Sequence, residues 1–225
     1  MSTTKTTTNT KRLSVLAMFI AIAYICLFVF RIKVNFLTLE LKDVFITMTG
    51  FIFGPLTAVC VALVEALLEM VTLSDTGFLG ALMNFIGSAS FALTASLIYK
   101  YKKNLVGAVI GLIAAVVVMT AVMLLLNIFI TPIYMHVDRS VVYTMIPSLL
   151  LPFNLIKGTL NAAVLFVLYK PLSEALKSLK LIPKADNFKF DKKTLVVSLI
   201  ALAIITAAIV CLIVFMNGNV EWIRK

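Results

Sequence analysis

Histidine and cysteine are scarce in this sequence, and motifs of catalysis or nucleotide binding are lacking. His136 is the single histidine, which excludes an HExxH zinc site and any cluster of histidines. Cys26, Cys60 and Cys211 each stand alone inside an apolar run, so they fit small packing residues and not metal or redox sites. A serine triad is formally possible, but it has no nucleophile-elbow motif behind it. With no P-loop segment for ATP either, the sequence does not predict an enzyme.

Charge is also sparse. Charged residues make up 13% of the 225 residues, whereas 62% are hydrophobic and the mean hydropathy is +1.09. This composition excludes an ordinary soluble domain. The net charge of +10 would suggest a nucleic-acid partner in a soluble protein. Here the basic residues lie between apolar runs, as in the cytoplasmic loops of membrane proteins. We therefore expect a lipid bilayer as the surroundings and no nucleic acid as a partner.

Seven apolar runs divide the chain, and most are long enough to cross a bilayer, since about 20 helical residues cover the roughly 30 Å hydrocarbon core. The predicted spans are residues 13–32, 44–53, 55–72, 79–99, 105–131, 144–169 and 194–216. The second is short and ends at a predicted turn, Gly54-Pro55, because proline disfavours helix in the residue before it. A polar loop is predicted for residues 132–143.

These spans predict an all-α membrane protein. Its parts are a tail (1–12), a membrane domain of six helices (13–172), a basic linker (173–193), an additional C-terminal transmembrane helix (194–216) and a second tail (217–225). Thirteen lysines and arginines flank the spans on the side of the N-terminus and six on the other side. The positive-inside rule then predicts a cell-membrane protein with its N-terminus in the cytoplasm and its C-terminus outside.

The stretch 151–161 places a charge in the middle of an apolar span. Asn154, Lys157 and Asn161 are three and four residues apart, which stacks them on one face of a helix. A lysine at membrane depth costs from a few to more than ten kcal/mol unless it faces protein, a partner or a wet cavity. We expect this face to line a binding site for a small molecule with polar edges.

Further polar residues belong to the same half of the predicted bundle. Asn84 and Asn127 lie toward the outer ends of their spans, at the depth expected for Asn154 and Lys157. Residues 33–42 alternate apolar and polar from Leu37 onward, which is typical of an extended segment. This segment is either a lid over a pocket or a plain connecting loop. The alternative to a pocket is a structural network, since asparagines also hydrogen-bond between membrane helices.

Two acidic residues occupy the third span. Glu65 and Glu69 are four residues apart near its outer end. Each is either a partner for Lys157 or a residue of the membrane–water interface. We expect the interface for Glu69 and leave Glu65 open between the two.

Several of these segments resemble one family in order along the chain. They are Phe36–Val44, Gly50–Leu56, Gly80–Asn84, Leu126-Asn127 and Pro152–Gly158. They look like the S components of energy-coupling factor (ECF) vitamin transporters, and most like the riboflavin-binding branch. The resemblance covers about residues 13–172. Its more specific part is the Asn-x-x-Lys of the sixth span together with the asparagine of the fifth.

The resemblance implies a six-helix protein that captures riboflavin from outside as a transported substrate and needs no cofactor. By that resemblance, Asn127, Asn154 and Lys157 hydrogen-bond the flavin, and Leu39 belongs to the loop that covers it. We add Asn84 as a candidate ligand contact because of its depth.

The partners implied are a transmembrane coupling protein and two cytoplasmic ATPases. Ala17 and Ala21 match the family's AxxxA motif, which faces the coupling protein. Spacing alone leaves them equally open to an ordinary place in a helix.

The chain departs from the riboflavin branch in two places. Phe45 stands where proline is usual, and the seventh span has no counterpart in the six-helix core. Another vitamin or vitamin precursor is therefore the alternative ligand. A membrane enzyme would have only Lys157 with Glu65 as its acid–base pair. A stand-alone secondary transporter would usually show internal repeats with broken helices, and only one break, at Gly54-Pro55, is visible.

Overall fold

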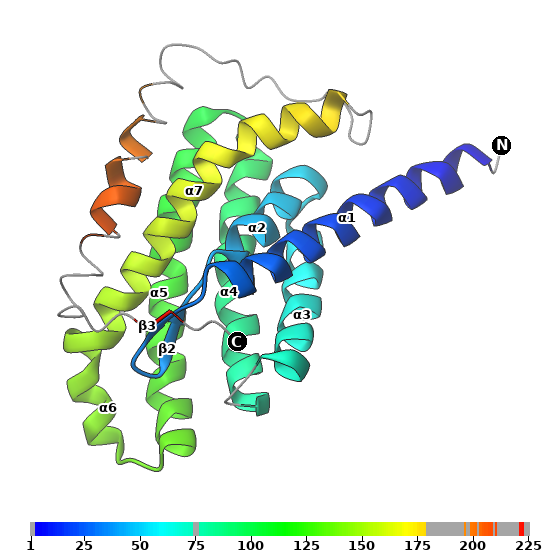
Figure 1. Ribbon diagram of the computed structural model, residues 1–225. Coiled ribbons are helices and arrows are strands. Elements are labelled where there is room, and N and C mark those ends of the chain that lie inside the picture. Colours follow the sequence, from blue (N-terminus) through cyan, green and yellow to red (C-terminus); the bar gives the residue numbers. More distant parts are fainter. Residues whose placement is uncertain are drawn as a thin grey trace.

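The computed structural model describes residues 3–73, 77–178, 196, 199–201, 203–208, 210 and 221–222. The helices are α1 (Thr3–Val29), α2 (Lys42–Phe53), α3 (Pro55–Thr72), α4 (Gly77–Tyr101), α5 (Leu105–Met135), α6 (Arg139–Met145) and α7 (Leu151–Ser178). They form one bundle in which α4 packs on both α3 and α5, and α7 packs on α5 (Figure 1). The all-α membrane architecture predicted from the sequence is confirmed.

Five helical segments of the described chain are long and apolar enough to cross a membrane. The sixth member of the bundle, α2, has 12 residues, as the short second run predicted. The predicted turn after it is confirmed, because α2 ends at Phe53 and α3 begins at Pro55. Gly54 joins them with φ = 106°, a backbone conformation that a residue with a Cβ adopts only under strain.

The segment leading into α7 is irregular. A π-helical turn (η1, Ile146–Leu150) joins α6 to α7. Pro152 follows it, and proline cannot donate the hydrogen bond that the carbonyl four residues earlier would receive in an α-helix. A π turn is one of the recognised ways to accommodate such a break. The chain is therefore irregular just before Asn154.

The polar loop predicted for residues 132–143 is wrong. Helix α5 continues through Pro132 to Met135, and α6 begins at Arg139, which leaves only residues 136–138 between them. Membrane helices tolerate proline because neighbouring groups satisfy the freed carbonyl. The helix ends where His136 adopts a left-handed conformation, with φ = 53°.

The extended segment predicted after the first span is a β-hairpin. Strand β1 (Ile32–Val34) pairs antiparallel with β2 (Leu37–Leu39), so that Lys33 faces Thr38. Asn35 takes φ = 55° in the tight turn, a conformation that asparagine tolerates. A third strand, β3 (Glu221–Trp222), pairs with the other edge of β1 and gives the order β2-β1-β3.

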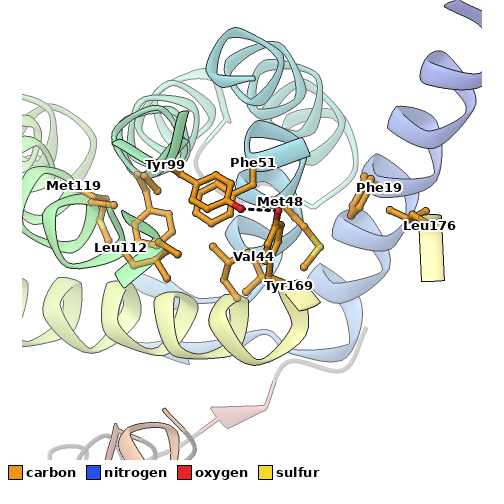
Figure 2. Close-up of a cluster of buried hydrophobic side chains, with 14 of the residues drawn as sticks. Phe19, Val44, Met48, Phe51, Tyr99, Leu112, Met119, Tyr169 and Leu176 are labelled. Carbon is orange, nitrogen blue, oxygen red and sulfur yellow. Dashed lines mark hydrogen bonds between the residues drawn. The ribbon is translucent and has the colours of Figure 1, made fainter. Parts of the chain in front are cut away.

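An aromatic cluster fills the bundle between α2, α4 and α7. The rings of Phe51 and Tyr99 stack with centroids 4.3 Å apart, and Tyr169 meets both rings edge-on. Figure 2 shows the hydroxyl groups of Tyr99 and Tyr169 hydrogen-bonded to each other, at 3.1 Å. All three residues are buried. We call this group the aromatic core.

Most of the predicted linker (173–193) and additional helix (194–216) lies outside the described residues. Within 194–216 the structure describes residues 196, 199–201, 203–208 and 210, all helical. The additional transmembrane helix therefore stays a prediction.

Candidate ligand-binding site

A cavity of about 200 Å³ lies between the hairpin and the bundle. Its walls come from the hairpin and from α2, α3, α4, α5 and α7. Asn84, Asn127, Asn154 and Lys157, which the sequence placed at one depth, all line it. Met119 lines the cavity and also belongs to the apolar cluster that contains the aromatic core. The apolar cluster therefore borders the cavity at Met119.

The two asparagines of α5 and α7 are held by their own helices. The side-chain amide of Asn127 donates to the Met123 carbonyl at 2.7 Å, and its Oδ1 accepts from the Thr131 hydroxyl at 2.8 Å. The Asn154 amide donates to the Leu150 carbonyl, the last residue of the π turn, at 2.8 Å. Both side chains are almost fully buried. These bonds fix the orientation of each amide before any ligand arrives.

Lys157 is the cationic group of the same wall. Its Nζ lies 3.0 Å from Glu40 Oε1 and 3.4 Å from the Thr38 carbonyl. Neither Glu65 nor Glu69, the partners considered from the sequence, forms this pair. One turn further along α7, the Asn161 amide donates to the Glu40 main-chain carbonyl at 2.9 Å. The sequence placed Asn161 on the binding face, whereas the structure uses it to hold the end of the hairpin.

Glu40 is the partner of Lys157 that the sequence analysis missed. It is 117 residues from Lys157 in the chain, so helical spacing carried no signal of the contact. Burial by itself would raise the pKa of Glu40, but the Lys157 and Lys42 ammonium groups beside it outweigh burial and lower the pKa to about 2. Glu40 is therefore ionised at neutral pH, and the Lys157 ammonium is balanced by a carboxylate while still facing the cavity.

The expectation that Glu69 lies at the membrane–water interface is wrong. Glu69 is 3% exposed, forms a salt bridge with the buried Lys42, and accepts a hydrogen bond from the Asn84 amide at 2.8 Å. Lys42 also lies 3.4 Å from Glu40. A continuous chain of side chains, Asn84–Glu69–Lys42–Glu40–Lys157, thus connects two walls of the cavity. The physical reason for the error is Lys42, whose burial the sequence gave no reason to expect.

Glu65, which the sequence left open, lies inside the bundle. It is fully buried, and neither of its carboxylate oxygens has a hydrogen-bond partner among the described residues. It does not line the cavity.

A second carboxylate, held by a hydroxyl group, completes the cavity wall. Asp43, at the start of α2, accepts a hydrogen bond from the Ser88 hydroxyl of α4 at 2.5 Å, and both residues line the cavity.

Leu39, which the resemblance placed in the loop that covers the ligand, is not on the cavity wall. It packs beneath the hairpin in a small apolar cluster with Phe153, while its neighbours Leu37 and Thr38 line the cavity.

The predicted interface alanines lie on the outside of the bundle. Ala17 and Ala21 are exposed, while Phe19 and Ala23 of the same helix are buried against the bundle. The pair is therefore accessible to another helix.

Comparison with known proteins identifies the architecture. A model of the family described as "ECF transporter, substrate-specific component" matches residues 11–169. The riboflavin transporter RibU of Staphylococcus aureus (strain TCH60) is 37% identical over 178 residues, covering 74% of this chain and 93% of the relative. The riboflavin transporter FmnP of Bacillus subtilis (strain 168) is 27% identical, covering 75% of this chain and 96% of the relative.

A solved structure agrees with these sequence matches. It is described as "Structure and mechanism of the S component of a bacterial ECF transporter" and has a TM-score of 0.65 at 36% identity, covering 75% of this chain and 99% of the solved one. Since the family match covers more than half of the sequence, this chain belongs to the family of substrate-specific components of ECF transporters.

Proposed function

We propose that this chain is the riboflavin-binding membrane subunit of an ECF-type importer. The observation that carries the proposal is the convergence of Asn84, Asn127, Asn154 and Lys157 on one cavity beneath the hairpin. Lysine offers donors only, and asparagine offers both a donor and an acceptor. The carbonyls, ring nitrogens and hydroxyl groups of a flavin complement these groups. The names of the two relatives, both riboflavin transporters, support the same ligand.

The hairpin acts in this proposal as the cover of the bound vitamin. Thr38 and Glu40 contact Lys157, and Phe36 meets Tyr134 of α5 edge-on. Contacts to both α5 and α7 suit a segment that closes over the ligand, as expected of the loop that contains Leu39. Opening it would release the ligand toward the side of the membrane on which the hairpin lies.

Transport would use energy from partner subunits. The sequence has no P-loop, so ATP hydrolysis would come from two cytoplasmic ATPases, linked through a transmembrane coupling protein. The exposed Ala17 and Ala21 are the proposed contact with that protein, since small residues four apart allow close approach of a second helix. Reorientation of the whole subunit would then deliver the vitamin to the cytoplasm.

The proposed orientation has the N-terminus in the cytoplasm and the hairpin outside. The distribution of lysine and arginine supports it. The pairing of β3 with β1 supports a C-terminal end on the same outer side as the hairpin.

Absorbance of the purified protein tests the ligand. Bound flavin should give a yellow preparation, or added riboflavin should bind stoichiometrically with quenching of its fluorescence. A colourless protein that does not bind added riboflavin but binds another vitamin would favour the alternative ligand.

A substitution at the exposed alanines tests the coupling surface. Ala21→Leu should abolish uptake in the assembled transporter while leaving riboflavin affinity unchanged. The control is Leu13→Ala, on the exposed side of the same helix.

A further inference from the structure

Two sides of the cavity carry opposite hydrogen-bonding chemistry. The α5–α7 side presents the Lys157 ammonium and the amides of Asn127 and Asn154. The α2–α4 side presents two carboxylates, Asp43 and Glu69, each bonded to a polar residue of α4. We define the acidic wall as Asp43, Glu69, Asn84 and Ser88. The sequence analysis predicted no ligand contact for its two carboxylates.

The two carboxylates are held in a fixed geometry. Glu69 is oriented by Lys42 and Asn84, and Asp43 by Ser88. Both are 3% exposed, so a ligand in the cavity would meet them with little competing water. A buried carboxylate accepts strong hydrogen bonds, and a hydroxyl group is a neutral donor that can supply them.

Resting on the proposed function, we infer that the acidic wall binds the polyhydroxyl side chain of the vitamin, while the α5–α7 side binds the heteroatoms of its ring. Riboflavin has the matching polarity, with a ring edge that mainly accepts hydrogen bonds and a ribityl chain of hydroxyl donors. This assignment fixes the direction of the ligand in the cavity. It also makes Asp43 and Glu69 the residues that select a flavin with its sugar-like chain over one without it.

Two basic residues of the lining are compatible with this assignment. Arg31 and Lys33 also line the cavity, and Arg31 donates to the Leu73 carbonyl at 3.2 Å. A hydroxyl group both donates and accepts. Arg31 and Lys33 can therefore donate hydrogen bonds to the oxygens of the same ligand hydroxyl groups that donate to Asp43 and Glu69.

The test compares riboflavin with lumiflavin, which keeps the ring and replaces the ribityl chain with a methyl group. Asp43→Asn and Glu69→Gln remove the charge and keep the shape of each acceptor. Because charged acceptors bind about twice as strongly as neutral ones, each variant should weaken riboflavin binding by about tenfold and change lumiflavin binding by less than about twofold. Glu174→Gln, a carboxyl-to-amide change at an exposed site outside the cavity, should change neither.

Lumiflavin binding also reports that each variant is folded. Equal weakening of both ligands, or no weakening of either, would overturn the inference while leaving the proposed function intact. A wild-type protein that binds riboflavin but not lumiflavin would also contradict it, because the ring would then have no recognition of its own. Failure of the wild type to bind riboflavin at all would instead refute the proposed function.

Discussion

The cavity and the aromatic core are built from the same helices, yet they are stabilised in different ways. At the cavity, side chains of α2, α3, α4 and α7 meet through salt bridges and through hydrogen bonds from asparagine amides, and they leave a space between them. Next to the aromatic core, α2 and α4 touch directly at Gly50, the residue before Phe51. A Cβ on Gly50 of α2 would lie 2.0 Å from Ser96 Oγ of α4, so only glycine fits there.

The difference separates the residues that bind from the residues that hold the bundle. Close packing excludes water and ligand, and it supplies most of the stability that a membrane bundle gains from contacts between helices. At the cavity, the polar network orients Lys157 through Glu40, and bonds within α5 and from α7 to the π turn orient Asn127 and Asn154. Changes at the aromatic core should therefore reduce stability without altering affinity, and changes at the cavity should do the reverse.

The largest effect on stability is expected from Phe51→Ala. Phe51 is buried against both Tyr99 and Tyr169, and removing a buried phenylalanine ring costs about 3–5 kcal/mol. Thermal unfolding in detergent should show a large decrease in Tm. The dissociation constant for riboflavin, measured on the folded protein, should stay within about threefold. A large loss of riboflavin affinity in a protein that is still folded would contradict the separation between residues that bind the ligand and residues that hold the bundle.

Lys157→Ala is the opposite case and should weaken riboflavin binding by about 10- to 100-fold, because a hydrogen bond from a charged donor to the ligand contributes about 1.5–3 kcal/mol. Glu40 keeps Lys42 at 3.4 Å as its partner, so the Tm should change little. Fluorescence quenching of riboflavin measures the affinity. The control is Lys170→Ala, a lysine of the same helix that pairs with the exposed Glu174. Unchanged affinity in Lys157→Ala would remove Lys157 from the site.

The same division appears in what the sequence could predict. The spans, the turn at Gly54 and the irregularity before Asn154 follow from local composition and from the backbone limits of glycine and proline. The depth of Asn84, Asn127 and Lys157 also follows, because position along a helix sets depth in the membrane. These local signals were enough to predict that the candidate ligand contacts lie at one depth, where they line the same cavity.

The pairing partners could not be predicted in this way. Glu40 and Lys42 lie at the end of the hairpin and the start of α2, and they reach residues 117 and 27 positions away. Such contacts depend on how the hairpin folds back onto the bundle, which no periodicity describes. The continuation of α5 past Pro132 was missed for a similar reason, since packing against neighbours decides whether a proline ends a helix.

Glu40→Gln should have a smaller, pH-dependent effect that sharpens the account of the cavity. The pKa of Glu40 is lowered to about 2 from its ordinary value of 4.5, so its ionised form stabilises the folded protein fully above pH 4.5. That contribution falls as the pH drops from about 4.5 to 2. The Tm difference between wild type and Glu40→Gln should therefore be constant from about pH 5 to 7 and shrink below pH 4.5. Acids remote from Glu40 titrate alike in both proteins and cancel in the difference. A difference that grows in acid would contradict the assigned charge state.

The smallest effect is expected from Tyr99→Phe, which removes one hydroxyl from the aromatic core and keeps its ring. The hydrogen bond to Tyr169 should contribute about 1 kcal/mol to the free energy of unfolding. Thermal unfolding of Tyr99→Phe, Tyr169→Phe and the double variant measures this coupling. If the two hydroxyls serve mainly each other, the double variant should lose less than the sum of the single losses, because each single variant already breaks the shared bond and leaves the other hydroxyl buried. Additive losses would mean that each hydroxyl is satisfied elsewhere. Riboflavin affinity should be the same in all three variants, since neither tyrosine lines the cavity.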